Sequence, residues 1–404
     1  MYPITFALLK ERKNPPDRRA VLSAASMLSA QERYPKACFI VEASEIRAFP
    51  DLDYEMAGFA VKSDISGADV MLGVKEVPVV ALIPNKKYFF FSHTIKKQPY
   101  NRDLLRAVLA KNIELYDHEV ITKASGLRLT GFGRYAGIVG AYNGFRAMGK
   151  KHKSFDLPPA NSLSGIEELH AQLAKIELPA IKILLTGTGK VAGGAQEILD
   201  ALGVKKVSVT NYLNKRFKTA VYCKIGVADY NRRKDGQKPN AKEFFRDPSG
   251  YESDFMRFAK VTQYFIAGHF YGQGAPYLFT REDAKREDFN IEVIADISCD
   301  IDGPVASTLR ASTIEDPFYG YDAQSESEVT MDTPGAIAVM AVDNLPCELP
   351  KDASEGFGQM FIEYVFPAFF NGDKDGILQR ARMTQNGKLT KRFSYLQDYV
   401  DGKE

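Results

Sequence analysis

The sequence lacks the features of a zinc ribbon, a disulfide-rich protein or a membrane protein. Its 404 residues include four cysteines, and none of them are in the C-x-x-C spacing of a metal site. No apolar run reaches the length of about 18 residues that a membrane span needs. The N-terminus has no basic stretch ahead of its apolar residues, as a signal peptide would. We therefore expect a cytoplasmic protein without a metal site or a membrane segment.

The sequence also lacks an excess of charge of one sign. Its 53 lysines and arginines and 51 aspartates and glutamates leave a net charge of +2. Nucleic-acid-binding proteins usually carry a strong basic excess, so we do not expect nucleic acid as a partner. Hydrophobic residues form 45% of the chain and charged residues 26%, which excludes large-scale disorder. The length predicts two or three domains.

Short apolar runs predict two α/β halves. In the first half they lie at 6–9, 38–41, 70–74, 88–91 and 113–116, and residues 23–32 and 102–111 have helical spacing. In the second half they lie at 181–185, 204–209, 261–266, 291–297 and 336–342. Strands alternating with helices predict mostly parallel sheets.

Three segments fall outside this alternation. Small residues at helical spacing within 131–148 predict close contact with another helix or a sheet. The polar stretch 149–164 has the composition of a linker. The basic stretch 211–260 is interpreted as an insertion, and its charged cluster fits a solvated loop better than a partner site.

A glycine-rich turn between a predicted strand and a predicted helix is the strongest local signal. Gly187, Gly189 and Ala192 form the pattern G-x-G-x-x-A. In this fingerprint the first glycine makes a tight turn, the second admits a pyrophosphate, and the third position packs helix on strand. Free N–H groups at the helix N-terminus then bind the phosphates. We predict a dinucleotide site here, the alternative being an incidental glycine turn.

The next strand in sequence carries no carboxylate that would bind a ribose 2′-hydroxyl. It ends at Thr210 and Asn211, and Lys215 and Arg216 follow closely. Because basic side chains suit a 2′-phosphate, NADP(H) is favoured over NAD(H). The same basic pair also fits a solvent-facing position.

Candidate acid–base residues follow two strands of the first half. Lys75 and Glu76 follow the run 70–74, and His93 follows the run 88–91. Open parallel sheets bind ligands at the carboxyl ends of their strands, and lysine and histidine both serve as acids or bases. From spacing alone, a solvated lysine and an ordinary loop histidine are the better interpretation.

Together these motifs resemble the lysine–ketoglutarate reductase (saccharopine-forming) family, within the alanine dehydrogenase, transhydrogenase and saccharopine dehydrogenase superfamily. The matching segments are 10–22, 72–76, 89–96, 131–137, 185–196, 296–300, 313–318, 342–346 and 349–358. The resemblance covers most of the chain and is weakest over 211–288. It implies two Rossmann-like domains with parallel sheets and an active site in the cleft between them. It further implies a substrate domain (1–150), a dinucleotide-binding domain (151–344) and a segment (345–404) that returns to the first domain.

The resemblance also implies roles for individual residues. Lys75 and His93 match the catalytic acid–base pair of the family. The implied substrate-binding residues are Arg19 and Arg128, which would bind carboxylates, together with Glu76, Lys96 and Glu119. The implied cofactor-binding residues are Gly187, Gly189, Lys190, Val191, Ala192, Thr210, Asn211, Asp296 and Asp343.

The implied activity is that of an oxidoreductase acting on CH–NH groups. It would reduce the imine of lysine and 2-oxoglutarate to saccharopine with a reduced nicotinamide, or catalyse the reverse reaction. The chain has no room for the second domain of bifunctional members, so a monofunctional enzyme is expected. Small molecules are the expected partners, and a homo-oligomer is compatible with the sequence. Two alternatives stay open: an alanine or opine-type dehydrogenase using another amine or keto acid, and a non-catalytic NADP(H) sensor.

Overall fold

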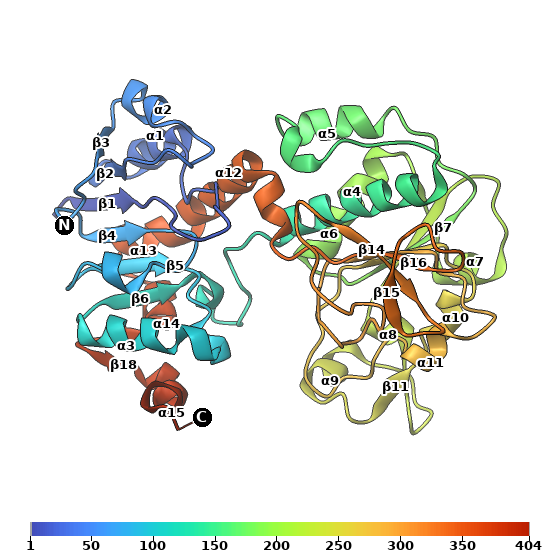
Figure 1. The fold of residues 1–404 in the computed structure, drawn as a ribbon. Coiled ribbons are helices and arrows are strands. Elements are labelled where there is room, and N and C mark those ends of the chain that lie inside the picture. Colours follow the sequence, from blue (N-terminus) through green and yellow to red (C-terminus); the bar gives the residue numbers. More distant parts are fainter. Residues whose placement is uncertain (1, 404) are drawn as a thin grey trace. The chain divides into compact units, whose positions relative to one another are not determined.

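The computed structural model describes residues 2–403 as two compact α/β units, which confirms the predicted fold class (Figure 1). Unit 1 combines the chain up to Phe132 with the segment from Pro350 onward, and unit 2 is Gly133–Leu349. The sequence placed these boundaries at 150/151 and 344/345. In the structure the first boundary lies before helix α4 (Gly133–His152), because α4 packs against helix α6 (Lys190–Ala201) of unit 2.

Unit 1 contains a six-stranded parallel sheet in the order β3-β2-β1-β4-β5-β6. The strands are β1 (Ile4–Leu8), β2 (Ala37–Glu42), β3 (Ala60–Lys62), β4 (Val70–Leu72), β5 (Lys87–Phe90) and β6 (Glu114–Asp117). All five predicted runs form strands, and most of their residues are buried. The parallel arrangement brings the ends of β4, β5 and β6 to one edge, where the residues that follow them gather.

The helices of unit 1 come from both ends of the chain. The N-terminal ones are α1 (Ala24–Arg33), α2 (Asp51–Met56) and α3 (Arg102–Ala110). The C-terminal segment adds α12 (Pro350–Met360), α13 (Phe366–Phe370), α14 (Ile377–Ala381), the hairpin β17 (Thr384–Gln385)–β18 (Lys388–Leu389), and α15 (Gln397–Asp401). In Figure 1 this segment, in orange and red, lies beside the blue and cyan strands. Phe6 of β1 contacts the rings of Phe366 and Phe369, so the segment completes the core of this unit.

Unit 2 contains an eight-stranded mixed sheet in the order β15-β14-β16-β13-β12-β7-β9-β8. The strands are β7 (Lys182–Thr186), β8 (Lys205–Lys206), β9 (Val221–Ile225), β12 (Tyr264–Ala267), β13 (Val293–Asp296), β14 (Phe318–Asp322), β15 (Ser327–Val329) and β16 (Ile337–Met340). β14 runs antiparallel to β15 and β16, whereas the remaining pairs are parallel. The sheet is therefore mostly parallel, as predicted, with one antiparallel edge at β14 and β15.

The interpretation of 211–260 as an insertion is wrong. The segment contains α7 (Val209–Asn214), β9, α8 (Val227–Tyr230), the hairpin β10 (Asn231–Arg233)–β11 (Tyr251–Ser253), α9 (Ala241–Arg246) and α10 (Met256–Ala259). β9 is almost entirely buried and lies next to β7. The strand predicted at 204–209 shortens to the exposed edge strand β8.

Glycines allow helices α4 and α6 to touch. A Cβ atom at Gly137 would lie 1.9 Å from the carbonyl oxygen of Val191, and one at Gly194 would lie 1.9 Å from that of Arg134. The close approach predicted for 131–148 is thus confirmed. Helices α5 (Ile166–Leu173) and α11 (Arg281–Ala284) complete the α-helices of unit 2. Among residues 2–403, no helix has the length and apolar character to cross a bilayer.

Candidate active site

In unit 1, His93, which follows β5, lies between two carboxylates that follow the strands on either side of β5. Its Nε2 is 3.7 Å from Oε1 of Glu76, which follows β4, and its Nδ1 is 3.8 Å from Oε2 of Glu119, which follows β6. Two cations lie near Glu119 Oε1: Lys96 Nζ at 3.2 Å and Arg128 Nη1 at 3.8 Å. The structure therefore brings the predicted catalytic histidine and four predicted substrate-binding residues into one cluster.

Glu119 stays ionised within this cluster. Burial opposes its ionisation, but His93, Lys96 and Arg128 outweigh that cost and lower its pKa to about 2. A permanent negative charge therefore lies beside the imidazole.

The turns that carry His93 and Glu119 are fixed by Asp117, the last residue of β6. Its Oδ2 accepts a hydrogen bond from the backbone N–H of Ser92 at 2.9 Å, and its Oδ1 accepts one from that of Glu119 at 2.7 Å. Asp117 is fully buried, and burial raises its pKa. His93 itself has a left-handed backbone (φ +53°), which is uncommon for a residue other than glycine.

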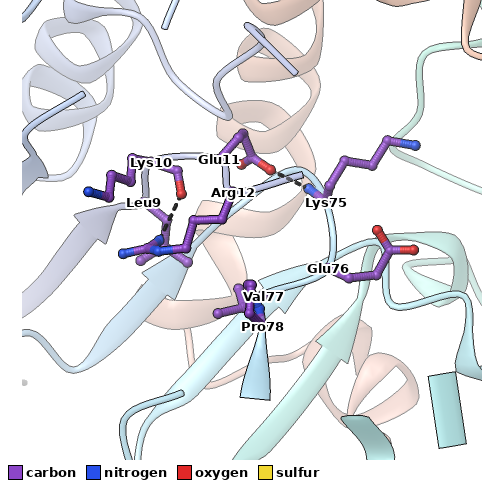
Figure 2. Close-up of a pocket in the computed structure, with 8 residues that line it drawn as sticks. All are labelled: Leu9, Lys10, Glu11, Arg12, Lys75, Glu76, Val77 and Pro78. Carbon is purple, nitrogen blue, oxygen red and sulfur yellow. Dashed lines mark hydrogen bonds between the residues drawn. The ribbon is translucent and has the colours of Figure 1, made fainter. Parts of the chain in front are cut away.

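The turn before Lys75 is held from two sides. Glu11 accepts hydrogen bonds from the backbone N–H groups of Val74 (2.7 Å) and Lys75 (2.8 Å), and the second of these is drawn in Figure 2. On the other side, Nε2–H of the buried His118 donates to the carbonyl oxygen of Gly73 at 2.9 Å. Burial lowers the pKa of His118 to about 3, so its ring is neutral and keeps one N–H. Burial raises the pKa of Glu11 to about 7.

A shallow pocket opens at this turn. Its lining residues, shown in Figure 2, are Leu9, Lys10, Glu11, Arg12, Lys75, Glu76, Val77 and Pro78. The sequence predicted Lys75 and Glu76 but missed Glu11, Asp117 and His118. Asp117 could have been found from its position at the end of a predicted strand, as Lys75 was.

Arg19 and Arg128 lie in different surroundings. Arg19 is buried, pairs with Asp17 through two hydrogen bonds (3.0 and 2.6 Å) and lies 4.3 Å from the ring centre of Phe132. Burial opposes ionisation of Asp17, but Arg19 outweighs it and, with Lys75, lowers the pKa of Asp17 to about 2. Arg128 is partly exposed, over the ring of Phe91. Arg19 is therefore linked to the Lys75 side of the site and Arg128 to the Glu119 side.

In unit 2, the glycine turn has the shape of a phosphate cradle. Gly187 has φ +105°, and a Cβ atom there would lie 2.4 Å from the carbonyl oxygen of Gly268. At Gly189, which caps α6, a Cβ atom would meet nothing within 4 Å, so a ligand can approach the backbone. Lys190 and Val191 begin the helix, and Ala192 is buried beneath the turn. The turn thus fits the dinucleotide that its sequence predicts.

The remaining predicted cofactor residues lie at several places in unit 2. Asp296, at the end of β13, is fully buried and accepts hydrogen bonds from Ser298, Cys299 and Thr308, so it anchors the following loop. Asp343 follows β16 and is exposed. Thr210 and Asn211 lie on α7 after the edge strand β8, which β9 separates from β7. The strand that precedes these two residues therefore adjoins β9 and not β7.

The sequence also missed His269, which lies beneath the glycine turn. Its Nδ1 is 2.7 Å from Oγ1 of Thr186, the last residue of β7. Its Nε2 has no hydrogen-bond partner among the described residues. Burial lowers the pKa of His269 to about 4, so the ring is neutral.

The fold and these two sites define a Rossmann-like α/β protein, and comparison with known proteins identifies its relatives. Residues 7–139 match the family described as "Alanine dehydrogenase/PNT, N-terminal domain". The chain is homologous to aminoadipic semialdehyde synthases and saccharopine dehydrogenases, which confirms the resemblance seen in the sequence.

Two of these relatives illustrate the extent of the similarity. "Alpha-aminoadipic semialdehyde synthase, mitochondrial" of Mus musculus is 29% identical over 99% of this chain and 48% of its own length. This chain therefore spans about half the length of that relative. "Saccharopine dehydrogenase [NAD(+), L-lysine-forming]" of Yarrowia lipolytica is 23% identical over 80% of this chain and 81% of its own.

Solved structures share the fold. An L-alanine dehydrogenase covers 98% of this chain and 99% of its own with a TM-score of 0.65 at 16% identity. A transhydrogenase from Sinorhizobium meliloti covers 96% and 100% with a TM-score of 0.57 at 14% identity. At these identities the likeness concerns the fold alone.

Proposed function

We propose that this chain is a nicotinamide-dependent oxidoreductase that reduces the imine formed between an amino acid and a 2-oxo acid. Lysine and 2-oxoglutarate, giving saccharopine, are the pair we favour, in either direction. The observation that carries the proposal is His93 between Glu76 and Glu119, on the same sheet edge as Lys75. The homology to saccharopine-forming enzymes supports the choice of substrates.

The chemistry before reduction consists of proton transfers. The amine nitrogen attacks the keto carbon and loses a proton while the keto oxygen gains one, and loss of water then gives the imine. These steps need one acid and one base within reach, for which we propose His93 and Lys75. Glu11 and His118 hold the backbone of the turn before Lys75, and Asp117 holds the turns of His93 and Glu119. A bound reduced nicotinamide would supply the hydride.

Two arginines suit a substrate with several carboxylates. The planar guanidinium group binds a carboxylate through two parallel hydrogen bonds. Arg128 is partly exposed beside the Glu119 cluster, and we propose that it binds a carboxylate directly. Arg19 is buried and pairs with Asp17, which balances its positive charge. A substrate carboxylate bound by Arg19 would therefore share the guanidinium group with Asp17.

The proposed cofactor is a nicotinamide dinucleotide bound at Gly187, Gly189 and the start of α6. The relatives and the shape of the glycine turn support this. Lys215 and Arg216, which favour NADP(H) in the sequence analysis, follow β8, and this strand adjoins β9 and not β7.

Oxidation of NADH and of NADPH by the purified chain tests the proposal. 2-Oxoglutarate is combined with lysine and a panel of other amines, and pyruvate with ammonia is run in parallel. We expect turnover with lysine that is lost in Lys75→Met and in His93→Ala, while Lys388→Met, at an exposed site, retains it. Turnover with pyruvate and ammonia instead would favour the alanine dehydrogenase alternative. Cofactor binding without any turnover would refute the reductase and favour a sensor.

A further inference from the structure

The strand next to β7 determines where a dinucleotide-binding unit selects its cofactor. β7 and β9 pair in parallel from Lys182–Val221 to Thr186–Ile225, whereas β8 pairs with β9 only. In such folds the side chain that follows the neighbouring strand contacts the adenosine ribose and distinguishes its 2′-hydroxyl from a 2′-phosphate. In this chain that position comes after Ile225, about fifteen residues beyond the segment that sequence order suggests.

The end of β9 is bonded to the glycine turn. The backbone N–H of Gly187 donates to the carbonyl oxygen of Ile225 at 2.9 Å. A Cβ atom at Gly226 would lie 3.3 Å from Cγ2 of Thr188, the residue between the two cradle glycines. Residues after Ile225 therefore begin directly beside the predicted phosphate site.

Asp229 is the carboxylate at this place. It lies in the turn of α8 that follows β9, and its Oδ2 accepts a hydrogen bond from the backbone N–H of Gly226 at 2.8 Å. The side chain is thereby fixed against Gly226, the residue beside Thr188. Its Oδ1 accepts no hydrogen bond from the described residues, and Asp229 is half-buried, so one acceptor is available to a ligand.

The arginine that contacts the backbone of Asp229 is already paired with another carboxylate. Arg257 donates to the backbone oxygen of Asp229 at 2.6 Å, but its guanidinium group also pairs with Asp254 at 2.8 Å. A 2′-phosphate placed here would meet the Asp229 carboxylate and an arginine that is already paired. A ribose 2′-hydroxyl would meet a charged acceptor.

We propose that Asp229 selects NAD(H), by accepting a hydrogen bond from the adenosine ribose and by repelling the 2′-phosphate of NADP(H). The inference deepens the proposed function and rests on it only for the presence of a dinucleotide at the glycine turn. It reverses the preference that sequence order alone suggests.

Binding of NADH and of NADPH to the full chain, followed by nicotinamide fluorescence without substrate, tests the inference. We expect NADH to bind at least about tenfold more tightly, the effect of one hydrogen bond to a charged group. Asp229→Asn keeps an acceptor for Gly226 N–H and should weaken NADH by about tenfold while NADPH binding is kept or improved. Asp229→Ser should shift the ratio in the same direction, and circular dichroism checks that both variants fold.

The double variant Lys215→Ala with Arg216→Ala is the matched control, because the sequence analysis predicts that these two residues favour NADP(H). The double variant should leave the NADH-to-NADPH ratio unchanged. Tighter NADPH binding by the wild type, an unchanged ratio in both Asp229 variants, or a selective loss of NADPH in the control would each overturn the inference. If neither NADH nor NADPH binds, both this inference and the proposed function are overturned. Selective NADH binding without imine reduction would support it and refute the reductase alone.

Discussion

The substitution Glu348→Gln tests whether a buried carboxyl group makes the stability of unit 2 depend on pH. Glu348 closes the 3₁₀ turn Leu345–Glu348 and is 1% exposed. Its Oε1 accepts a hydrogen bond from Asn143 of α4 at 2.7 Å, while Oε2 has no partner among the described residues. Burial raises its pKa from 4.5 to about 7, although Asn143 and Arg146 act in the opposite direction.

The sign and size of the effect follow from these two pKa values. Below pH 4.5 the group is protonated in both the folded and the unfolded chain, so it has no effect on stability. As pH rises toward 7, the unfolded chain loses this proton while the folded chain keeps it, and folding becomes less favourable. Above pH 7 the full cost applies; a shift from 4.5 to about 7 corresponds to about 3 kcal/mol. Glutamine does not titrate, so the variant lacks this loss.

Urea unfolding followed by circular dichroism measures the effect, because the chain has no tryptophan to serve as a fluorescent probe. The stability of Glu348→Gln relative to wild type should rise by about 3 kcal/mol between about pH 5 and about pH 9. The cost of burying the amide is equal at both pH values and cancels in this comparison. Glu177→Gln, at an exposed site of the same unit, is the control. A difference between variant and wild type that does not change with pH would refute the reasoning.

Three further substitutions have defined outcomes. Gly194→Ala places a methyl group against a backbone carbonyl and should lower the stability of unit 2 by about 3 kcal/mol, measured by thermal unfolding. Gly193→Ala, with open space around its Cβ, should leave the stability unchanged. Equal stability of the two variants would contradict the helix contact. Glu11→Gln can accept only one of its two backbone hydrogen bonds, so kcat should fall about tenfold with unchanged NADH binding, and a wild-type kcat would exclude a positioning role. Arg128→Ala should raise KM for 2-oxoglutarate about tenfold or more, measured by steady-state kinetics, and an unchanged KM would remove it from the substrate site.

The strands of unit 1 could be predicted because each is a continuous apolar run buried in a parallel sheet. β3 was missed because two of its three residues are exposed. The cluster around His93 could also be anticipated in part, since neighbouring parallel strands end at one edge. Glu11 and His118 could not, because their roles depend on which backbone groups of a distant strand they meet, and no local pattern records that.

Unit 2 shows a different limit of sequence reasoning. The glycine turn was recognisable because its conformational requirements are local. The identity of the strand beside β7 is not local, and reasoning from sequence order chose 204–209 where the structure has β9. The buried run 221–225 was a signal that this polar and basic segment contains a strand.

The double crossing of the chain between the units has a consequence for its synthesis on the ribosome. Unit 2 is contiguous, so all of its residues emerge before the segment that completes unit 1. Until then Phe6 lacks the rings of Phe366 and Phe369, and the core around Tyr88 lacks Met383, Phe393, Leu396 and Tyr399. The middle of the polypeptide can therefore fold first, while the N-terminal strands keep apolar surface exposed until the C-terminal segment has been synthesised.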